Sequence, residues 1–223
     1  MQETRAKAIP GFAGLLLVLL MAAAGMHLFL RGMGAAGGTV PPRLGRADVD
    51  MLVGGFVLVL AVVLTSGFVV VQPNLSRSVV FFGRYLGTLR ESGWWMVAPL
   101  TSKPEVSLRV RNFESQRLKV NDLRGNPIEI AAVVVWRVVD AARALFDVDA
   151  YEEFVKIQSE TGVRHIASHY PYDSFDDDRT PSLRANTDNV SADLARELQE
   201  RLAVAGVEVI DARLTHLAYA PEK

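Results

Sequence analysis

The stretch MLVGGFVLVLAVVLTSGFVVV, from Met51 to Val71, carries no charged residue over its 21 positions. As an α-helix it would be about 31 Å long, which matches the hydrocarbon core of a bilayer. It is too long for an ordinary buried strand and too poor in polar residues for an amphipathic surface helix. We therefore predict a membrane-spanning helix over Met51 to Val71, with the following sequence held at a membrane surface.

A second uncharged run, FAGLLLVLLMAAAGMHLFL from Phe12 to Leu30, follows an N-terminal tail of residues 1 to 11 that contains Arg5 and Lys7. A basic start, an apolar run and small residues also describe a cleaved signal peptide, and this alternative stays open. We favour a retained membrane span because the run continues past its alanine cluster to a full bilayer length.

The loop expected over residues 31 to 50 contains Gly32-Met33-Gly34-Ala35-Ala36-Gly37, which matches the pattern GxGxxG. A dinucleotide fingerprint needs a strand before this pattern and a helix after it, so a segment between two spans is not expected to bind a dinucleotide. Two spans place both ends of the chain on one side of the membrane. The balance of Lys and Arg near the spans favours the cytoplasmic side, in a multi-pass plasma membrane protein.

Charge is unevenly distributed after the second span. Residues 77 to 119 hold eight Lys or Arg against three Glu, whereas residues 120 to 223 hold 11 against 19 Asp or Glu. A basic segment beside a membrane is expected on an anionic leaflet, and the acidic excess of the remainder disfavours nucleic-acid binding. The candidate membrane-surface residues are Arg77, Arg84, Arg90, Trp94 and Trp95. Solvated cations and core-packed tryptophans are the open alternative.

Periodicity predicts an α+β domain after the spans. The β-branched run from Ile128 to Val139 is the most strand-like in the chain and should be central in an antiparallel sheet. Residues 141 to 146, 149 to 170 and 187 to 205 follow a helical pattern, and Gly206 ends the last of these helices. Residues 207 to 219 return to a strand pattern.

His165 and His169 form the one plausible metal-binding pair, since a spacing of four residues puts both on one side of a helix. They carry the second hypothesis, a membrane-tethered metal-dependent hydrolase. A zincin motif would place Glu after the first histidine, where this sequence has Ile166. The acidic run Asp176 to Asp178 is interpreted as a solvated loop. The chain has no cysteine, and we expect no catalytic residue, metal or cofactor.

Several motifs, in order, give the chain a family resemblance. They include Phe82-Gly83-Arg84-Tyr85, Asn126-Pro127-Ile128-Glu129-Ile130, Gln158-Ser159-Glu160, Tyr170-Pro171-Tyr172-Asp173 and Gly206-Val207-Glu208-Val209. Over about residues 69 to 221 the chain resembles the stomatin, prohibitin and flotillin superfamily, also called SPFH or band 7.

The resemblance implies an SPFH domain over residues 72 to 223, with a curved antiparallel sheet and helices packed on it. It implies a non-enzymatic scaffold that forms homo-oligomers, organises membrane microdomains, and binds partners such as membrane AAA+ proteases in protein quality control. The family usually continues into a coiled coil, whereas this chain ends at Lys223. We therefore expect either a piece of a longer protein or a member that lacks this segment.

Overall fold

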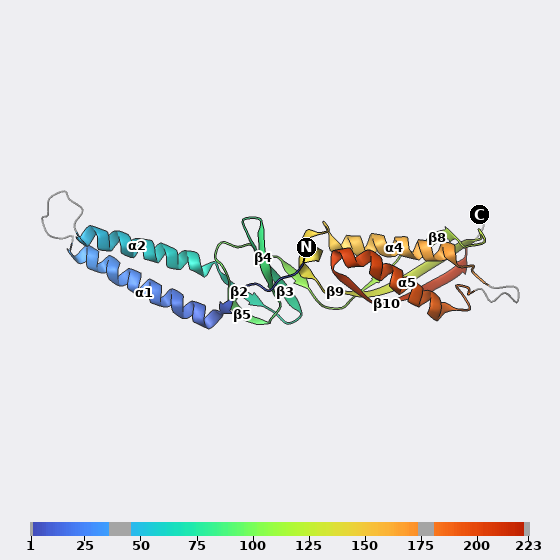
Figure 1. Cartoon of the computed structure of the whole chain (residues 1–223), viewed down its shortest axis with the longest axis horizontal. Helices are drawn as coiled ribbons and strands as arrows, with labels where there is room; N and C mark the ends of the chain where they lie inside the picture. Colours follow the sequence, from blue (N-terminus) through green and yellow to red (C-terminus); the bar gives the residue numbers. More distant parts are fainter. Residues whose placement is uncertain (1, 36–45, 174–180, 221–223) are drawn as a thin grey trace. The chain divides into compact units, whose positions relative to one another are not determined.

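A computed structural model describes residues 2–35, 46–173 and 181–220 (Figure 1). The chain forms two compact units. The helical-hairpin unit comprises residues 4–105, and the sheet–helix unit comprises the residues from Val106 onward together with the N-terminal residues up to Glu3.

Two antiparallel helices of the helical-hairpin unit, α1 (Gly11–Ala35) and α2 (Arg46–Thr65), lie side by side (Figure 1). The predicted run Phe12 to Leu30 is helical throughout and Met51 to Val71 is helical up to Thr65, but the predicted loop over residues 31 to 50 is wrong at both ends. Residues 31–35 continue α1 and residues 46–50 begin α2. Arg31, Met33 and Ala35, and likewise Arg46 and Ala47, favour a helix, although Gly32 and Gly34 do not.

The C-terminal limit predicted for the second span, Val71, is also wrong. Helix α2 ends at Thr65, and Phe68–Val71 form strand β2, which pairs with Gly93–Met96 of β5. The last turn is closed by the Ser66 hydroxyl, which donates to the Val63 carbonyl at 2.7 Å, and by the Gly67 N–H, which donates to the Leu64 carbonyl at 3.0 Å. Valine suits both a membrane helix and a strand, so an uncharged run does not reveal the change.

Two small sheets complete this unit. One has the order β1-β5-β2, with β1 at Ile9–Pro10. The other has the order β4-β3-β6, formed by β4 (Arg84–Leu89), β3 (Leu75–Phe81) and β6 (Glu105–Ser107), and the division between the two units falls after the first residue of β6. Between them lies a buried cluster of Ala6, Val69, Val71, Val79, Leu89 and Val97.

Strand β9 (Pro127–Val138) is the centre of the sheet in the sheet–helix unit, as predicted. Strand β10 (Val207–Tyr219) pairs antiparallel along one edge of β9. Along the other edge, β7 (Arg111–Glu114) and β8 (Leu118–Asn121) follow one another. The predicted α+β class with antiparallel sheets is therefore confirmed.

Helices α4 (Tyr151–His169) and α5 (Thr187–Leu202) lie over this sheet, and α3 (Ala141–Phe146) follows β9 (Figure 1). The predicted four-residue repeat of α5 is confirmed, because Val190, Leu194, Leu198 and Leu202 are all fully buried. They pack in one core with the alternate β9 residues Ile128, Ile130, Val134 and Trp136. Gly206 adopts φ +64° after the short 3-10 turn Ala203–Ala205, as its predicted role in ending the helix requires.

Candidate functional site

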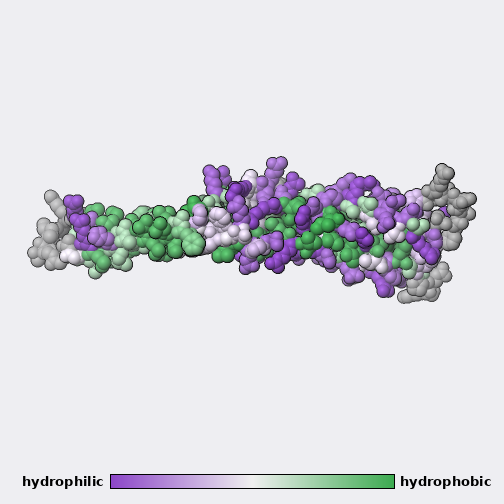
Figure 2. All heavy atoms as spheres, turned by 90° about the horizontal axis from the view of Figure 1, so that it is seen from below, coloured by the Kyte–Doolittle hydropathy of each residue, from purple (hydrophilic) through white to green (hydrophobic). Residues whose placement is uncertain are grey.

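The outward surface of the helical hairpin is apolar. Phe12, Phe56 and Val62 are 78%, 68% and 69% exposed, and the space-filling view shows apolar residues along the helices (Figure 2). Both helices are long and apolar enough to cross a membrane. An apolar surface of this extent is costly in water, so the hairpin is a candidate membrane anchor.

Glycines bring the two helices into close contact. A Cβ atom on Gly54 would stand 2.7 Å from the carbonyl oxygen of Gly25, and one on Gly32 would stand 2.6 Å from the carbonyl oxygen of Ala47. The backbones therefore approach each other at two levels of the hairpin. Small residues at helix contacts are the usual means of packing helices in lipid.

The residues before α1 belong to the sheets, so the prediction of a simple N-terminal tail is wrong. The Thr88 N–H donates to the Thr4 carbonyl at 2.7 Å, and the Ala6 N–H donates back to the Thr88 carbonyl at 3.1 Å. Ile9 then pairs with Met96 in β5. Because β5 also pairs with β2, which follows α2, one sheet holds both ends of the hairpin on the same side.

Lys103 connects the end of α2 to the following sheet. Its ammonium donates to the Ser66 carbonyl at 2.7 Å, and the Leu100 N–H donates to the Ser66 hydroxyl at 2.9 Å. Burial, and then the nearby positive charge of Arg77, lower the pKa of Lys103. Ser66 and Gly67 connect α2 to β2, and the contacts of Lys103 and Leu100 hold the backbone and side chain of Ser66.

The two predicted membrane-surface tryptophans lie in different surroundings. Trp94 lies at the base of the hairpin, with its ring edge-on to Phe12 at 5.2 Å and stacked on Phe68 at 5.1 Å between centroids. Trp95 packs against the buried cluster of the small sheets, and its indole N–H donates to the Glu91 carbonyl at 3.0 Å. Trp94 is therefore the one placed beside the first turn of α1.

The three predicted membrane-surface arginines also differ. Arg77 forms an ion pair with Glu105 at 2.5 Å and donates to the Lys103 carbonyl at 3.3 Å. Arg84 and Arg90 are exposed. Arg84 follows the turn at Phe82 and Gly83, where Phe82 is 82% exposed and adopts φ +43°. Arg77 thus has a structural partner, whereas Arg84 lies at an exposed, partly aromatic hairpin tip.

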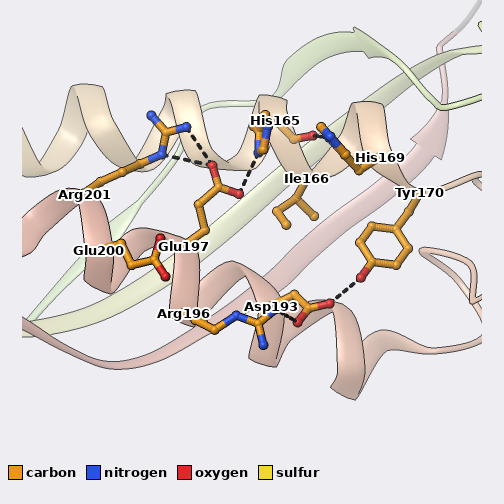
Figure 3. Close-up of a pocket in the computed structure, with 9 residues that line it drawn as sticks. All are labelled: His165, Ile166, His169, Tyr170, Asp193, Arg196, Glu197, Glu200 and Arg201. Atoms are coloured by element: carbon orange, nitrogen blue, oxygen red, sulfur yellow. Dashed lines mark hydrogen bonds and ion pairs between the residues drawn. The ribbon is translucent and has the colours of Figure 1, made fainter.

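In the sheet–helix unit, α4 and α5 border an open cleft of about 500 Å³ (Figure 3). His165 Nδ1 lies 2.7 Å from Glu197 Oε2, and the same carboxylate accepts hydrogen bonds from Arg201 at 2.8 and 3.0 Å. His169 Nδ1 instead lies 2.8 Å from the backbone carbonyl of His165. The hydrogen bond to Asp193, followed by burial, raises the pKa of the Tyr170 hydroxyl.

These contacts do not support the metal-dependent hydrolase. The two imidazole rings lie 4.2 Å apart between centroids, but their Nδ1 atoms have different partners, Glu197 for His165 and the His165 carbonyl for His169 (Figure 3). Within the described ranges, no three His, Asp or Glu side chains gather in a group able to hold a metal ion.

Two other motifs from the sequence can be placed. Gly32, Met33 and Gly34 lie inside α1, so a helix stands where a dinucleotide fingerprint needs a strand; Gly37 lies outside the described residues. The acidic run Asp176 to Asp178 also lies outside the described residues.

Sequence reasoning missed the N-terminal pairing, the glycine contact at Gly54 and the Lys103 contact. The sequence contains a weak indication of the N-terminal strand, because the small residues Thr4, Ala6 and Ala8 alternate with Arg5 and Lys7. The other two depend on residues that are distant in sequence and had no local signal.

Residues 65–222, or 158 of the 223 residues, match the family model described as SPFH domain / Band 7 family. The match begins at the last residue of α2 and extends through β10. No curated protein matches the chain significantly.

Proposed function

Because this chain belongs to the SPFH domain / Band 7 family, we propose that it is a membrane-anchored scaffold that assembles with copies of itself and organises the membrane around it. The SPFH domain is generally associated with membrane scaffolding, and the family is generally non-enzymatic. The observation that carries the proposal is an apolar helical hairpin whose two ends are built into one small sheet.

The hairpin anchors the chain by crossing the plasma membrane twice. Its outward side chains are apolar over both helices, and its backbone groups are paired within the helices, as a hydrocarbon environment requires. The sheets and the sheet–helix unit then lie in the cytoplasm, on the side favoured by the basic residues around Arg5 and Lys7.

The connection between anchor and sheets supports a scaffold role because it is restrained on both sides. The segment from Thr4 to Pro10 pairs before α1, and Lys103 holds the backbone at Ser66 after α2. Trp94 adds packing between Phe12 and Phe68. A restrained connection gives the small sheets a defined orientation to the bilayer, so that neighbouring copies meet in the same orientation.

The charged cleft between α4 and α5 supports a structural role over catalysis. Glu197 is engaged by His165 and Arg201, and Asp193 by Tyr170 and Arg196. Carboxylates paired in this way are not poised as general acids or bases. We therefore propose that the chain is not an enzyme and uses no cofactor, and the acidic excess of residues 120 to 223 argues against nucleic acid as a partner.

The proposed partners are the bilayer, further copies of the chain, and a membrane protein such as an AAA+ protease that the assembly regulates. Two copies with different tags, expressed together and extracted in mild detergent, test self-assembly. Recovery of the second tag with the first is expected, and separately expressed copies mixed after extraction are the control. Recovery of monomers alone would contradict the scaffold, and mass spectrometry of the same samples identifies co-purifying membrane proteins.

A further inference from the structure

An apolar groove of about 300 Å³ lies at the base of the helical hairpin. One wall is formed by Leu64 of α2 and by the chain from Met96 to Pro99, and the other by the segment from Lys7 to Ile9. The lining contains one cation, Lys7, and no carboxylate. All of these residues lie near the first residue of α1 or the last turn of α2.

The position of the groove relates it to the lipid surface. Leu64 belongs to the last turn of α2, and Ile9 stands two residues before the start of α1 at Gly11. If the hairpin crosses the membrane, the groove opens where the helices leave the hydrocarbon, and Leu64 in its wall continues the apolar surface of α2. This step rests on the membrane insertion included in the proposed function.

The apolar lining of the groove suits the acyl chain of a lipid. A single acyl chain lying along it would bury its methylene groups against Leu64, Met96 and Val97.

The charge at the rim of the groove favours an anionic headgroup. Lys7 is exposed at this rim, whereas the neighbouring cation Arg5 is paired with Glu91 at 2.6 Å. We infer that the groove binds an anionic phospholipid, with one acyl chain along the apolar lining and its phosphate at Lys7. The protein would then bind anionic lipids beside the hairpin in preference to neutral ones.

Tryptophan fluorescence in vesicles tests this inference, because Trp94 and Trp95 immediately precede the groove residue Met96. The full chain is reconstituted with brominated phosphatidylglycerol or brominated phosphatidylcholine, which quench nearby tryptophans. A preference of about fivefold for the anionic lipid is expected, corresponding to one additional cation at the lipid surface.

Four variants make the test specific. Lys7→Ala should abolish the preference, and Lys7→Arg should keep it. Ala98→Phe adds a ring at an exposed position in the lining and should also abolish the preference by filling the groove. Lys156→Ala, an exposed cation of the sheet–helix unit paired with Glu153, is the matched control and should leave the preference unchanged.

The possible failures are distinguishable. Quenching by neither lipid would overturn both membrane insertion and the lipid groove. Equal quenching by both lipids would overturn the groove alone. If the preference for the anionic lipid is lost in Lys7→Ala but retained in Ala98→Phe, the lipid binds to the open surface around Lys7. That result would also contradict lipid binding in the groove.

Discussion

Gly54 of α2 lies so close to Phe29 of α1 that a Cβ atom on Gly54 would stand 2.5 Å from the Phe29 backbone nitrogen. The adjacent Gly55 has only a flexible ring atom of Phe29 within reach, at 3.9 Å. A side chain at Gly54 would therefore clash with α1, whereas one at Gly55 would not. Alanine substitutions at these two neighbouring positions form a matched pair.

We predict that Gly54→Ala lowers the stability of the detergent-solubilised protein by about 1 to 3 kcal/mol, because the helices must separate to admit the methyl group. Gly55→Ala should be neutral or slightly stabilising, since alanine favours the helix. Thermal unfolding followed by circular dichroism measures both. Equal stability of the two variants would show that the hairpin does not depend on this contact.

Gly206 gives a second prediction, for the end of the helical segment in the sheet–helix unit. It adopts φ +64°, and a Cβ atom there would stand 2.4 Å from the carbonyl oxygen of Asp140. Gly206→Ala should therefore lower the free energy of unfolding by more than about 2 kcal/mol, through backbone strain and the clash together.

Gly125→Ala is the control for that experiment, because Gly125 has φ +83° but nothing within 4 Å of its added Cβ. It should cost only the backbone strain, about 1 kcal/mol. A loss as large for Gly125→Ala as for Gly206→Ala would refute the role assigned to the Asp140 contact.

Asp122 gives a prediction about pH. Burial opposes its charge, but hydrogen bonds from the N–H groups of Tyr172, Asn126 and Arg124 outweigh burial and lower the pKa of Asp122. Because the folded-state pKa is lowered, these bonds stabilise the protein above the ordinary aspartate pKa of about 4. That contribution is lost as the pH falls through the lowered value.

Asp122→Asn should consequently lose about 2 to 4 kcal/mol at pH 7, since the amide cannot accept all of these hydrogen bonds. Its deficit relative to the native sequence should shrink as the pH falls below about 4. Unfolding curves between pH 3 and 7 test this, with the exposed Asp149→Asn as control. A deficit that does not change with pH would contradict the assignment.

The absence of cysteine makes membrane orientation directly measurable. We predict that Gly34→Cys, near the far end of α1, reacts with a membrane-impermeant maleimide on intact cells. Ser92→Cys, in the small sheets, should react only after lysis. The Cβ of residue 34 meets no neighbour within 4 Å, and Ser92 is exposed, so both sites tolerate the change. The opposite labelling pattern would place the sheets outside the cytoplasm.

The histidine cluster gives a prediction against a metal site. Chelators should leave the melting temperature unchanged, and metal analysis should find no stoichiometric zinc. His165→Ala should cost no more than about 1 kcal/mol, because the His165 side chain is about half exposed and Glu197 keeps its ion pair with Arg201. Stoichiometric zinc that disappears in His165→Ala would revive the hydrolase hypothesis.

Periodicity predicted much of the fold because each main element has one buried face. The repeat from Val190 to Leu202 and the β-branched run in β9 follow directly from burial against a single core. The α+β class was predictable for the same reason, whereas the two hydrophobic helices were predictable from their long uncharged runs.

The boundary at Thr65 was not predictable in this way. Phe68–Val71 is as apolar as the helix before it, and it becomes a strand because Gly93–Met96 is available to pair with it. Partner strands outweigh local propensity in a sheet, and the pairing of Ala6 with Thr88 escaped prediction for the same reason.

The N-terminal pairing also has a consequence for biosynthesis. Arg5 forms a bridge with Thr88, so the first strand residues to leave the ribosome must wait until more than 80 further residues have been made before they can pair. Contacts between such distant parts of a chain form slowly. The helical hairpin can therefore insert while its N-terminal segment is still unpaired, and the small sheets close as a late step that completes the anchor.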